Sequence, residues 1–236
     1  MSSIFLAAVI FLSFLTLSLA GFGHALVAMP LLTPILGLRL AAPLVALISI
    51  TGETLMLIRH RRALHFRTVR RLLVGSIAGI PLGVLLLGAD EVVGPKVLGL
   101  IAAAYGLYGL LNLRLPHIRH PNWAVVFGFT AGLFTGAYNT GGPPLVIYGT
   151  CRRWDPAEFK SSLQGLFVVN SLVVVSTHAL AGNFNPPVWH SFWMALPAMA
   201  LGLLVGFRLE RYVNPRLFRR LVLILLVILG VRLLLG

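Results

Sequence analysis

The chain has 236 residues, of which 58% are hydrophobic and 11% charged, and its mean hydropathy is +0.93. This composition is far from that of a soluble domain and is typical of an integral membrane protein. A net charge of +13 would suggest nucleic-acid binding in a soluble protein, but here it follows from basic loops beside the membrane, so no nucleic-acid partner is expected. The single cysteine, Cys151, excludes an internal disulfide and a multi-cysteine metal site.

Apolar runs long enough to cross roughly 30 Å of hydrocarbon as helices recur along the whole chain. Alternation with period two is absent, which disfavours a β-barrel. Residues 1–236 are therefore predicted to form one all-α polytopic membrane domain. The first run, residues 4–20, could be mistaken for a signal peptide, but no basic residue precedes it, and it is predicted to be a retained helix.

The sequence "GFGH", Gly21 to His24, interrupts the apolar pattern directly after this first helix. An apolar continuation containing Pro30 and Pro34 follows, and residues 40–58 are predicted to span the membrane and to end at the first basic loop.

Four short basic loops determine the predicted topology. Together they hold 16 of the 19 Lys and Arg residues, and the positive-inside bias places all four in the cytoplasm. The loops are residues 59–71, 114–120, 152–160 and 208–220. The spans expected between and after them are residues 72–88, 97–113, 161–180, 191–207 and 221–235.

Residues 121–151 lie between two basic loops and must therefore enter and leave the membrane on the cytoplasmic side. The sequence "NTGGPP", residues 139–144, stands at their middle and predicts a broken helix whose second piece starts near Pro144, since proline suits a first helical position. Irregular backbone at membrane depth requires protein or a water-filled cavity to satisfy it. The break is therefore expected to line a site.

The two interrupted segments predict two inverted repeats, residues 1–116 and 117–236, each a broken helical hairpin plus three transmembrane helices. The first hairpin would enter from outside and the second from inside. Gly79 with Gly83, and Gly202 with Gly206, form matching pairs in the two halves. Paired interrupted helices of this kind indicate the central site of a transporter.

If both second pieces start near the midplane, two helix N-termini converge there and favour an anion. The alternative is that the glycines only permit tight helix packing, which is the expectation for Gly75, Gly83 and Gly106. The candidate substrate-binding residues are Gly21, Phe22, Gly23, His24, Asn139, Thr140, Gly141, Gly142, Pro143, Pro144, Gln164 and Asn170.

Glu53 is the only acid within a predicted span, and it could carry a coupling proton, lean toward the cytoplasmic interface, or pair with an arginine of the first basic loop. His24 could bind the anion or hydrogen-bond a free carbonyl. Gln164 and Asn170 could line the cavity or join helices through hydrogen bonds. His178 and Trp189 are expected to anchor the outer boundary.

The sequences "GFGHALVAMPLL", "NTGGPPLVIY" and "RRALHFR" resemble those of the TauE/SafE family of membrane transporters, also called the sulfite exporter family, and the resemblance covers nearly the entire chain. It implies transport of sulfite, sulfonates and related organic anions across the cytoplasmic membrane, usually outward. The glycine-rich motif of the family maps onto Gly21, Gly23 and Pro30, and again onto Gly141, Gly142 and Pro144. His24 stands where many members carry a further glycine.

The sequence thus predicts a secondary transporter of small anions in the inner membrane that works by alternating access. An anion channel, or a carrier for a non-sulfur carboxylate, is the alternative. The motifs GxSxG, HExxH and GxxxxGK[ST] are absent, so neither an enzyme nor an ATP-driven pump is expected, and no cofactor or metal. The expected partners are the anion and the lipid bilayer, and a homodimer is left open.

Overall fold

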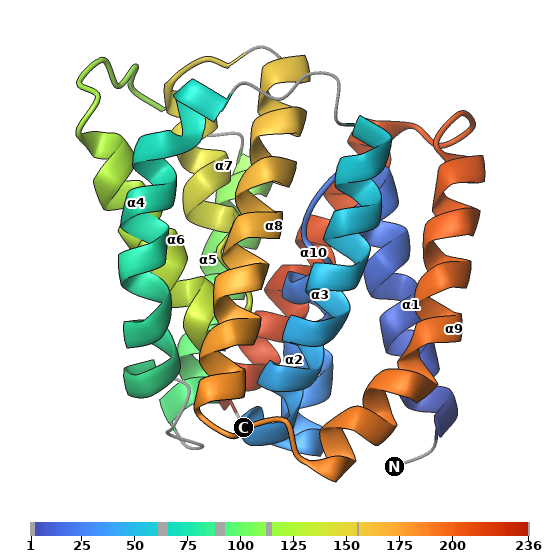
Figure 1. The fold of residues 1–236 in the computed structure, drawn as a ribbon. Coiled ribbons are helices and arrows are strands. Elements are labelled where there is room, and N and C mark those ends of the chain that lie inside the picture. Colours follow the sequence, from blue (N-terminus) through green and yellow to red (C-terminus); the bar gives the residue numbers. More distant parts are fainter. Residues whose placement is uncertain (1–2, 61–65, 88–92, 112–114, 155, 236) are drawn as a thin grey trace.

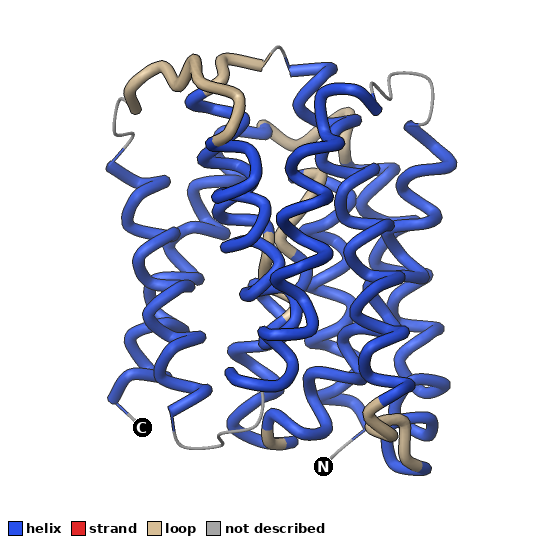
Figure 2. Tube along the Cα trace, turned by 60° about the vertical axis from the view of Figure 1, so that its left-hand side comes forward, coloured by secondary structure: helices blue, strands red, loops and turns tan. Residues whose placement is uncertain are grey.

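The computed structural model describes residues 3–60, 66–87, 93–111, 115–154 and 156–235. Within these residues the chain forms helices joined by short loops, arranged as one bundle (Figures 1 and 2). The α-helices are α1 (Ser3–Ala20), α2 (His24–Leu36), α3 (Leu38–His60), α4 (Phe66–Leu82, continued by a π-helical turn at Gly83–Leu87), α5 (Val93–Leu111), α6 (Trp123–Tyr138), α7 (Gly142–Cys151), α8 (Pro156–Leu180), α9 (Pro186–Leu209) and α10 (Pro215–Leu235).

Five of these helices are long and apolar enough to cross a membrane, namely α1, α3, α5, α8 and α9. Many large apolar side chains on the outside of the bundle are exposed, as expected where lipid rather than water is the neighbour. The predicted class, an all-α polytopic membrane protein, is confirmed.

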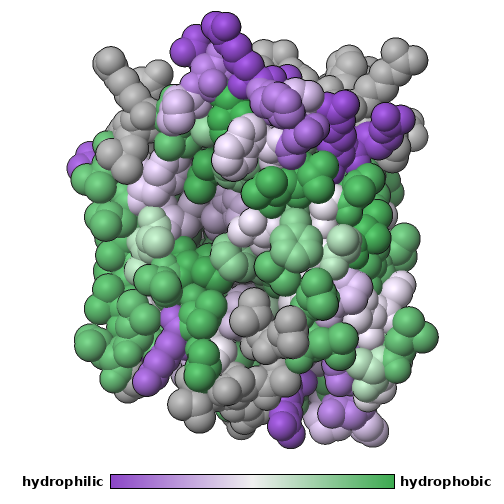
Figure 3. All heavy atoms as spheres, turned by 90° about the vertical axis from the view of Figure 1, so that its left-hand side faces the viewer, coloured by the Kyte–Doolittle hydropathy of each residue, from purple (hydrophilic) through white to green (hydrophobic). Residues whose placement is uncertain are grey.

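The two ends of the bundle differ in charge. Both chain termini lie at one end, which we call the terminal end (Figure 1). Hydrophilic residues gather at the opposite end, which we call the basic end (Figure 3). That the basic end faces the cytoplasm stays a prediction. The starts of α4 and α10, the loop before α6 and the ends of α7 and α9 lie at this end (Figure 1). The described arginines of these segments are Arg70, Arg71, Arg119, Arg152, Arg153, Arg208, Arg211, Arg219 and Arg220.

Two broken hairpins enter the bundle from opposite ends (Figure 1). Helix α1 starts at the terminal end, the chain breaks at residues 21–23, and α2 returns to the terminal end. Helix α6 starts at the basic end, the chain breaks at residues 139–141, and α7 returns to the basic end. Gly23, with φ of 94°, and Asn139, with φ of 55°, take the left-handed conformation that ends or redirects a helix.

Glycines allow the long helices to approach backbone to backbone. A Cβ atom on Gly75, Gly79 or Gly83 of α4 would collide with the backbone of α6, and one on Gly106 would collide with the backbone of α10. The predicted packing role of Gly75, Gly83 and Gly106 is therefore confirmed.

Equivalent helices of the two predicted halves form equivalent packing pairs. Helix α4 packs on α6 through Gly79, and α9 packs on α1 through Gly202, whose added Cβ would meet the carbonyl of Phe11. The matching pairs support a duplication at residues 116/117, which stays a prediction.

Replacing Gly79 by alanine is expected to destabilise the fold by about 1–3 kcal/mol, because the new methyl group overlaps backbone atoms of Phe129 and Leu133 that cannot move aside. The measurement is thermal unfolding of the purified protein in detergent. Thr130→Ala, on an exposed turn of the same α6 segment, is the control and should leave the midpoint unchanged. An unchanged midpoint for Gly79→Ala would contradict the close approach of α4 and α6.

Four predicted helix starts are wrong by five or six residues, and the first is that of α4, which begins at Phe66 rather than at residue 72. Helices α8, α9 and α10 begin at Pro156, Pro186 and Pro215, inside the segments predicted as loops. Proline at the first helical position needs no hydrogen-bond acceptor for its nitrogen, and Asn185 caps α9 by accepting a hydrogen bond from the Val188 amide at 3.2 Å. These loop prolines therefore start helices.

Candidate functional site

A small internal cavity lies where the two breaks meet. Its volume, as space open to the centre of a water molecule, is about 20 Å³, enough for about one water molecule. Both broken hairpins contribute to its wall, so the predicted meeting of the two helix starts is seen in the structure. The lining residues are Gly23, His24, Ala25, Leu26, Glu53, Thr135, Asn139, Thr140, Gly141, Gly142, Phe167, Asn170 and Ser171.

The starts of two helices line this space. The amides in the first turn of α2 and of α7 have no acceptor within their own helix. In α7 the two prolines, Pro143 and Pro144, carry no amide hydrogen, so Gly141 and Gly142 supply the N–H groups at this helix start. The positive ends of two helix dipoles are thus directed at one small cavity.

The two glycines of the second break have different roles. A Cβ on Gly141 would overlap the Thr135 side chain, so helix packing accounts for that glycine. A Cβ on Gly142 would meet only Phe22 and Phe167, at 3.7 Å and 3.8 Å, which are ordinary contact distances. Packing therefore does not require glycine at position 142, and its missing side chain leaves space in the cavity.

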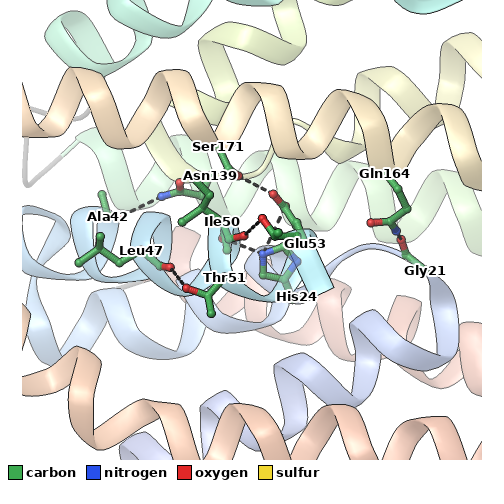
Figure 4. Close-up of polar contacts among 12 residues, drawn as sticks. Gly21, His24, Ala42, Leu47, Ile50, Thr51, Glu53, Asn139, Gln164 and Ser171 are labelled. Atoms are coloured by element: carbon green, nitrogen blue, oxygen red, sulfur yellow. Dashed lines mark hydrogen bonds and ion pairs between the residues drawn. The ribbon is translucent and has the colours of Figure 1, made fainter. Parts of the chain in front are cut away.

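An acid and a histidine share the wall of the cavity (Figure 4). Glu53 of α3 accepts a hydrogen bond from the Ser171 hydroxyl of α8 at 2.5 Å, and its other carboxyl oxygen lies 3.7 Å from His24 Nε2. The same His24 nitrogen lies 2.7 Å from the Ser49 hydroxyl. Glu53 and His24 are both about 95% buried, so the alternative for Glu53, a position leaning toward the membrane interface, is wrong. Its described partners are a serine and a histidine rather than an arginine.

Several buried polar atoms around the cavity have no hydrogen-bond partner within the described residues. They are His24 Nδ1, Thr140 Oγ1 and both amide atoms of Asn170. Since buried polar groups in proteins are almost always paired, this cluster marks a place where a polar ligand or water would bind.

Two hydrogen bonds join the breaks to the facing long helices, one on each side of the acid–histidine pair (Figure 4). The Asn139 side-chain amide donates to the Ala42 carbonyl of α3 at 2.9 Å, and we call this the terminal-side link. The Gln164 side-chain amide of α8 donates to the Gly21 carbonyl, and we call this the basic-side link. Each link joins a break of one predicted repeat to a helix of the other.

The structure divides the predicted site residues into two groups. Seven of the twelve candidates, and also Glu53, line the cavity: Gly23, His24, Asn139, Thr140, Gly141, Gly142 and Asn170. The other five, which are Gly21, Phe22, Pro143, Pro144 and Gln164, are outside its lining. Pro143 and Pro144 instead face a separate apolar pocket between α5, α6 and α7. Gln164 joins two helices, as the alternative for that residue anticipated.

Sequence reasoning missed four polar or aromatic neighbours of the cavity, namely Ser49, Thr135, Phe167 and Ser171. A serine or threonine in a membrane helix commonly bonds a carbonyl of its own helix, as Thr135 does with Ala131, so residue type alone gave no signal. One signal existed for Ser171. It lies seven residues after Gln164, and therefore two turns along the same face of α8.

His178 is not the interfacial anchor that the sequence suggested. Its side chain is 4% exposed, and its Nδ1 lies 2.8 Å from the side-chain amide nitrogen of Asn183. Trp189 is 41% exposed and keeps a surface position. The difference arises because the turn at residues 181–185 folds back over the end of α8 and covers the histidine.

The family model described as "Sulfite exporter TauE/SafE" matches residues 6–233. A similar protein from Cupriavidus necator, "Probable sulfite/organosulfonate exporter TauE", is 26% identical over 213 residues, which cover 86% of this chain and 82% of that protein. A second, from Comamonas testosteroni, "Probable inner membrane transporter protein TsaS", is 25% identical over 175 residues, or 73% of each chain. No solved structure matches. The chain therefore belongs to the TauE/SafE family of multi-pass membrane transporters and is not an enzyme.

Proposed function

We propose that the protein is a secondary transporter that exports small anions, such as sulfite or sulfonates, across the inner membrane. The cavity between the two breaks carries this proposal, because helix N-termini from opposite hairpins and unpartnered polar side chains meet there. The names of the two relatives, an exporter of sulfite or organosulfonates and an inner-membrane transporter, support the substrate class and the location.

An anion fits this cavity better than a cation or a neutral solute. The amides of Gly141 and Gly142 and the first turn of α2 are donors, and Asn170 offers one further N–H pair. Small oxyanions accept hydrogen bonds at every oxygen, so they match a wall rich in donors.

Glu53 would repel an anion unless a proton neutralises the carboxylate or resides on the neighbouring His24. A proton bound by this pair and an anion in the cavity therefore favour each other, and by linkage each strengthens binding of the other. The proposed cycle moves an anion together with a proton, held by the Glu53–His24 pair and oriented by Ser171 and Ser49, and it exports the anion when the outward anion gradient exceeds the opposing pH gradient.

Alternating access would proceed by breaking the two links in turn. In the conformation described here both links are formed, and the cavity is too small for a sulfonate group. Separation of Asn139 from α3 would open the cavity toward the terminal end, and separation of Gln164 from the first break would open it toward the basic end. With basic loops in the cytoplasm, the terminal end would face outside.

The test is counterflow in proteoliposomes with sulfite, sulfate, methanesulfonate and acetate, beside choline and glycerol, with and without a pH gradient. We expect saturable exchange of sulfite and methanesulfonate, driven toward the alkaline compartment. Exchange of acetate alone would favour the carboxylate carrier. Flux that never saturates would favour a channel, and transport of choline or glycerol without any anion would refute the proposal.

A further inference from the structure

A second polar space lies between the central cavity and the terminal end. Its volume is about 410 Å³, compared with about 20 Å³ for the central cavity. Several exposed residues line it, including Arg39, Leu85 and Asn185, so it reaches the surface, and we call it the vestibule. Its described lining residues are Leu38, Arg39, Ala42, Pro43, Val84, Leu85, Gly136, Ala137, His178, Ala181, Gly182, Asn183 and Asn185, and none of these is acidic.

The vestibule and the central cavity share a thin wall. Thr135 and Asn139 line the cavity, whereas the residues between them, Gly136 and Ala137, line the vestibule. The terminal-side link joins the two spaces, because Asn139 lines the cavity and its acceptor, Ala42, lines the vestibule. One hydrogen bond and one turn of helix therefore separate a space at the surface from the candidate site.

The wall toward the basic end is thicker. Besides the basic-side link, a buried apolar cluster fills this region, and it includes Leu26, which also lines the cavity. Other members of this cluster are Leu145 and Val146 of α7 and Leu163 and Leu166 of α8. The described conformation is thus nearest to opening on the terminal side.

His178 lines the vestibule and has a ring nitrogen without a partner among the described residues. The side-chain nitrogen of Asn183 can only donate, so His178 Nδ1 accepts its hydrogen bond, and in the neutral ring the proton then resides on Nε2. His178 Nε2 is buried and has no partner within the described residues. An anionic oxygen would satisfy a buried ring N–H that lacks an acceptor, and Arg39 also lines this space.

One face of α8 connects the vestibule to the candidate site. Gln164, Ser171 and His178 follow one another at intervals of seven residues, which places them on the same face and about 10 Å apart along the helix. They belong in turn to the basic-side link, the acid–histidine pair and the vestibule. A small anion could thus pass from one polar group to the next along this face.

We propose that the vestibule is a second binding site for a small oxyanion, held by Arg39 and by the Nε2 hydrogen of His178, with Asn183 as a positioning residue. The assignment of its ligand class rests on the proposed function. The site receives an anion from the central cavity when the terminal-side link breaks, and it holds that anion before release.

The structure supplies its own reporter for this site. The His178 ring is 6.2 Å from the Phe184 ring, which is 6.0 Å from the Trp189 ring, so binding at His178 is expected to alter Trp189 fluorescence. The experiment titrates the purified full-length protein with methanesulfonate in a buffer free of other sulfonates. The same preparations are reconstituted to measure methanesulfonate counterflow.

We expect a saturable fluorescence change in the unmodified protein, and its loss in Trp189→Phe with transport intact. His178→Phe and Arg39→Gln should each raise the Kd at least about tenfold, whereas His178→Gln, which keeps an N–H donor, should stay within about threefold. Unchanged binding in both His178→Phe and Arg39→Gln would overturn the proposal, as would transport without any saturable signal. If the protein binds methanesulfonate in a His178-dependent way but transports no anion, this site stands and the proposed function is refuted.

Discussion

Gly142→Ala is expected to fold normally and to lose at least about 90% of anion transport. The Cβ would stand at ordinary contact distance from Phe22 and Phe167, so no neighbour must move, and the φ of Gly142 is not in the left-handed range. Alanine also suits a helix better than glycine, by about 1 kcal/mol in a helix interior. The methyl group nevertheless enters a cavity of about 20 Å³ and blocks approach of an anion to the backbone. A tenfold loss corresponds to roughly 1.4 kcal/mol.

Initial rates of methanesulfonate counterflow, normalised to the reconstituted protein, are the measurement. Thr150→Ala is a matched control on α7, because Thr150 is exposed, lies outside the cavity lining and donates a hydrogen bond to the Val146 carbonyl of its own helix. Gly141→Ala is a contrasting variant, since its Cβ would overlap Thr135 and should lower the yield of folded protein. Full transport by Gly142→Ala would show that substrate does not approach the backbone at this position.

Glu53→Gln is expected to uncouple transport from the pH gradient while preserving exchange. The amide has nearly the size of the carboxyl group, its oxygen can still accept the hydrogen bond from Ser171, and its nitrogen can face His24. The variant cannot carry a proton at this position. Accumulation driven by a pH gradient should therefore fall to the level without a gradient, and counterflow at equal pH should remain within about threefold of the unmodified protein.

The measurement compares methanesulfonate uptake into vesicles with an alkaline interior and into vesicles at equal pH. Methanesulfonate stays ionised, so its own protonation does not contribute. Glu210→Gln, at the end of α9, is the control and should respond to the gradient like the unmodified protein. Retention of gradient-driven uptake by Glu53→Gln would remove Glu53 from the coupling step.

The arrangement of hydrophobic runs and basic loops was sufficient to predict the membrane class and the course of the chain. Because a helix must satisfy its own backbone in lipid, every long apolar run had one available structure. The breaks at "GFGH" and "NTGGPP" were predictable for the same reason, since glycine and proline disrupt a helix locally. Helix starts were less predictable, because Pro156, Pro186 and Pro215 start helices inside segments that were predicted as loops from their charge and polarity.

The site was only partly predictable. Glu53 and His24 stood out because a charged or titratable residue in an apolar run is rare. Ser49 and Ser171 did not, because their importance comes from hydrogen bonds to those two residues across 25 and 118 positions of sequence. Likewise, nothing local distinguishes Gly142 from Gly141, yet one faces open space and the other faces Thr135.

By itself, the sequence determined that this chain spans the membrane as helices and breaks two of them, since those outcomes depend on local hydrophobicity and on backbone freedom. Only the tertiary structure decided that the breaks meet around Glu53 and His24, that Pro143 and Pro144 face away, and that His178 is buried beside a second polar space. The physical reason is that these contacts depend on the rotation and depth of each helix. Rotation and depth are determined by glycine-mediated packing between distant segments, such as the packing of Gly79 of α4 against α6 and of Gly202 of α9 against α1.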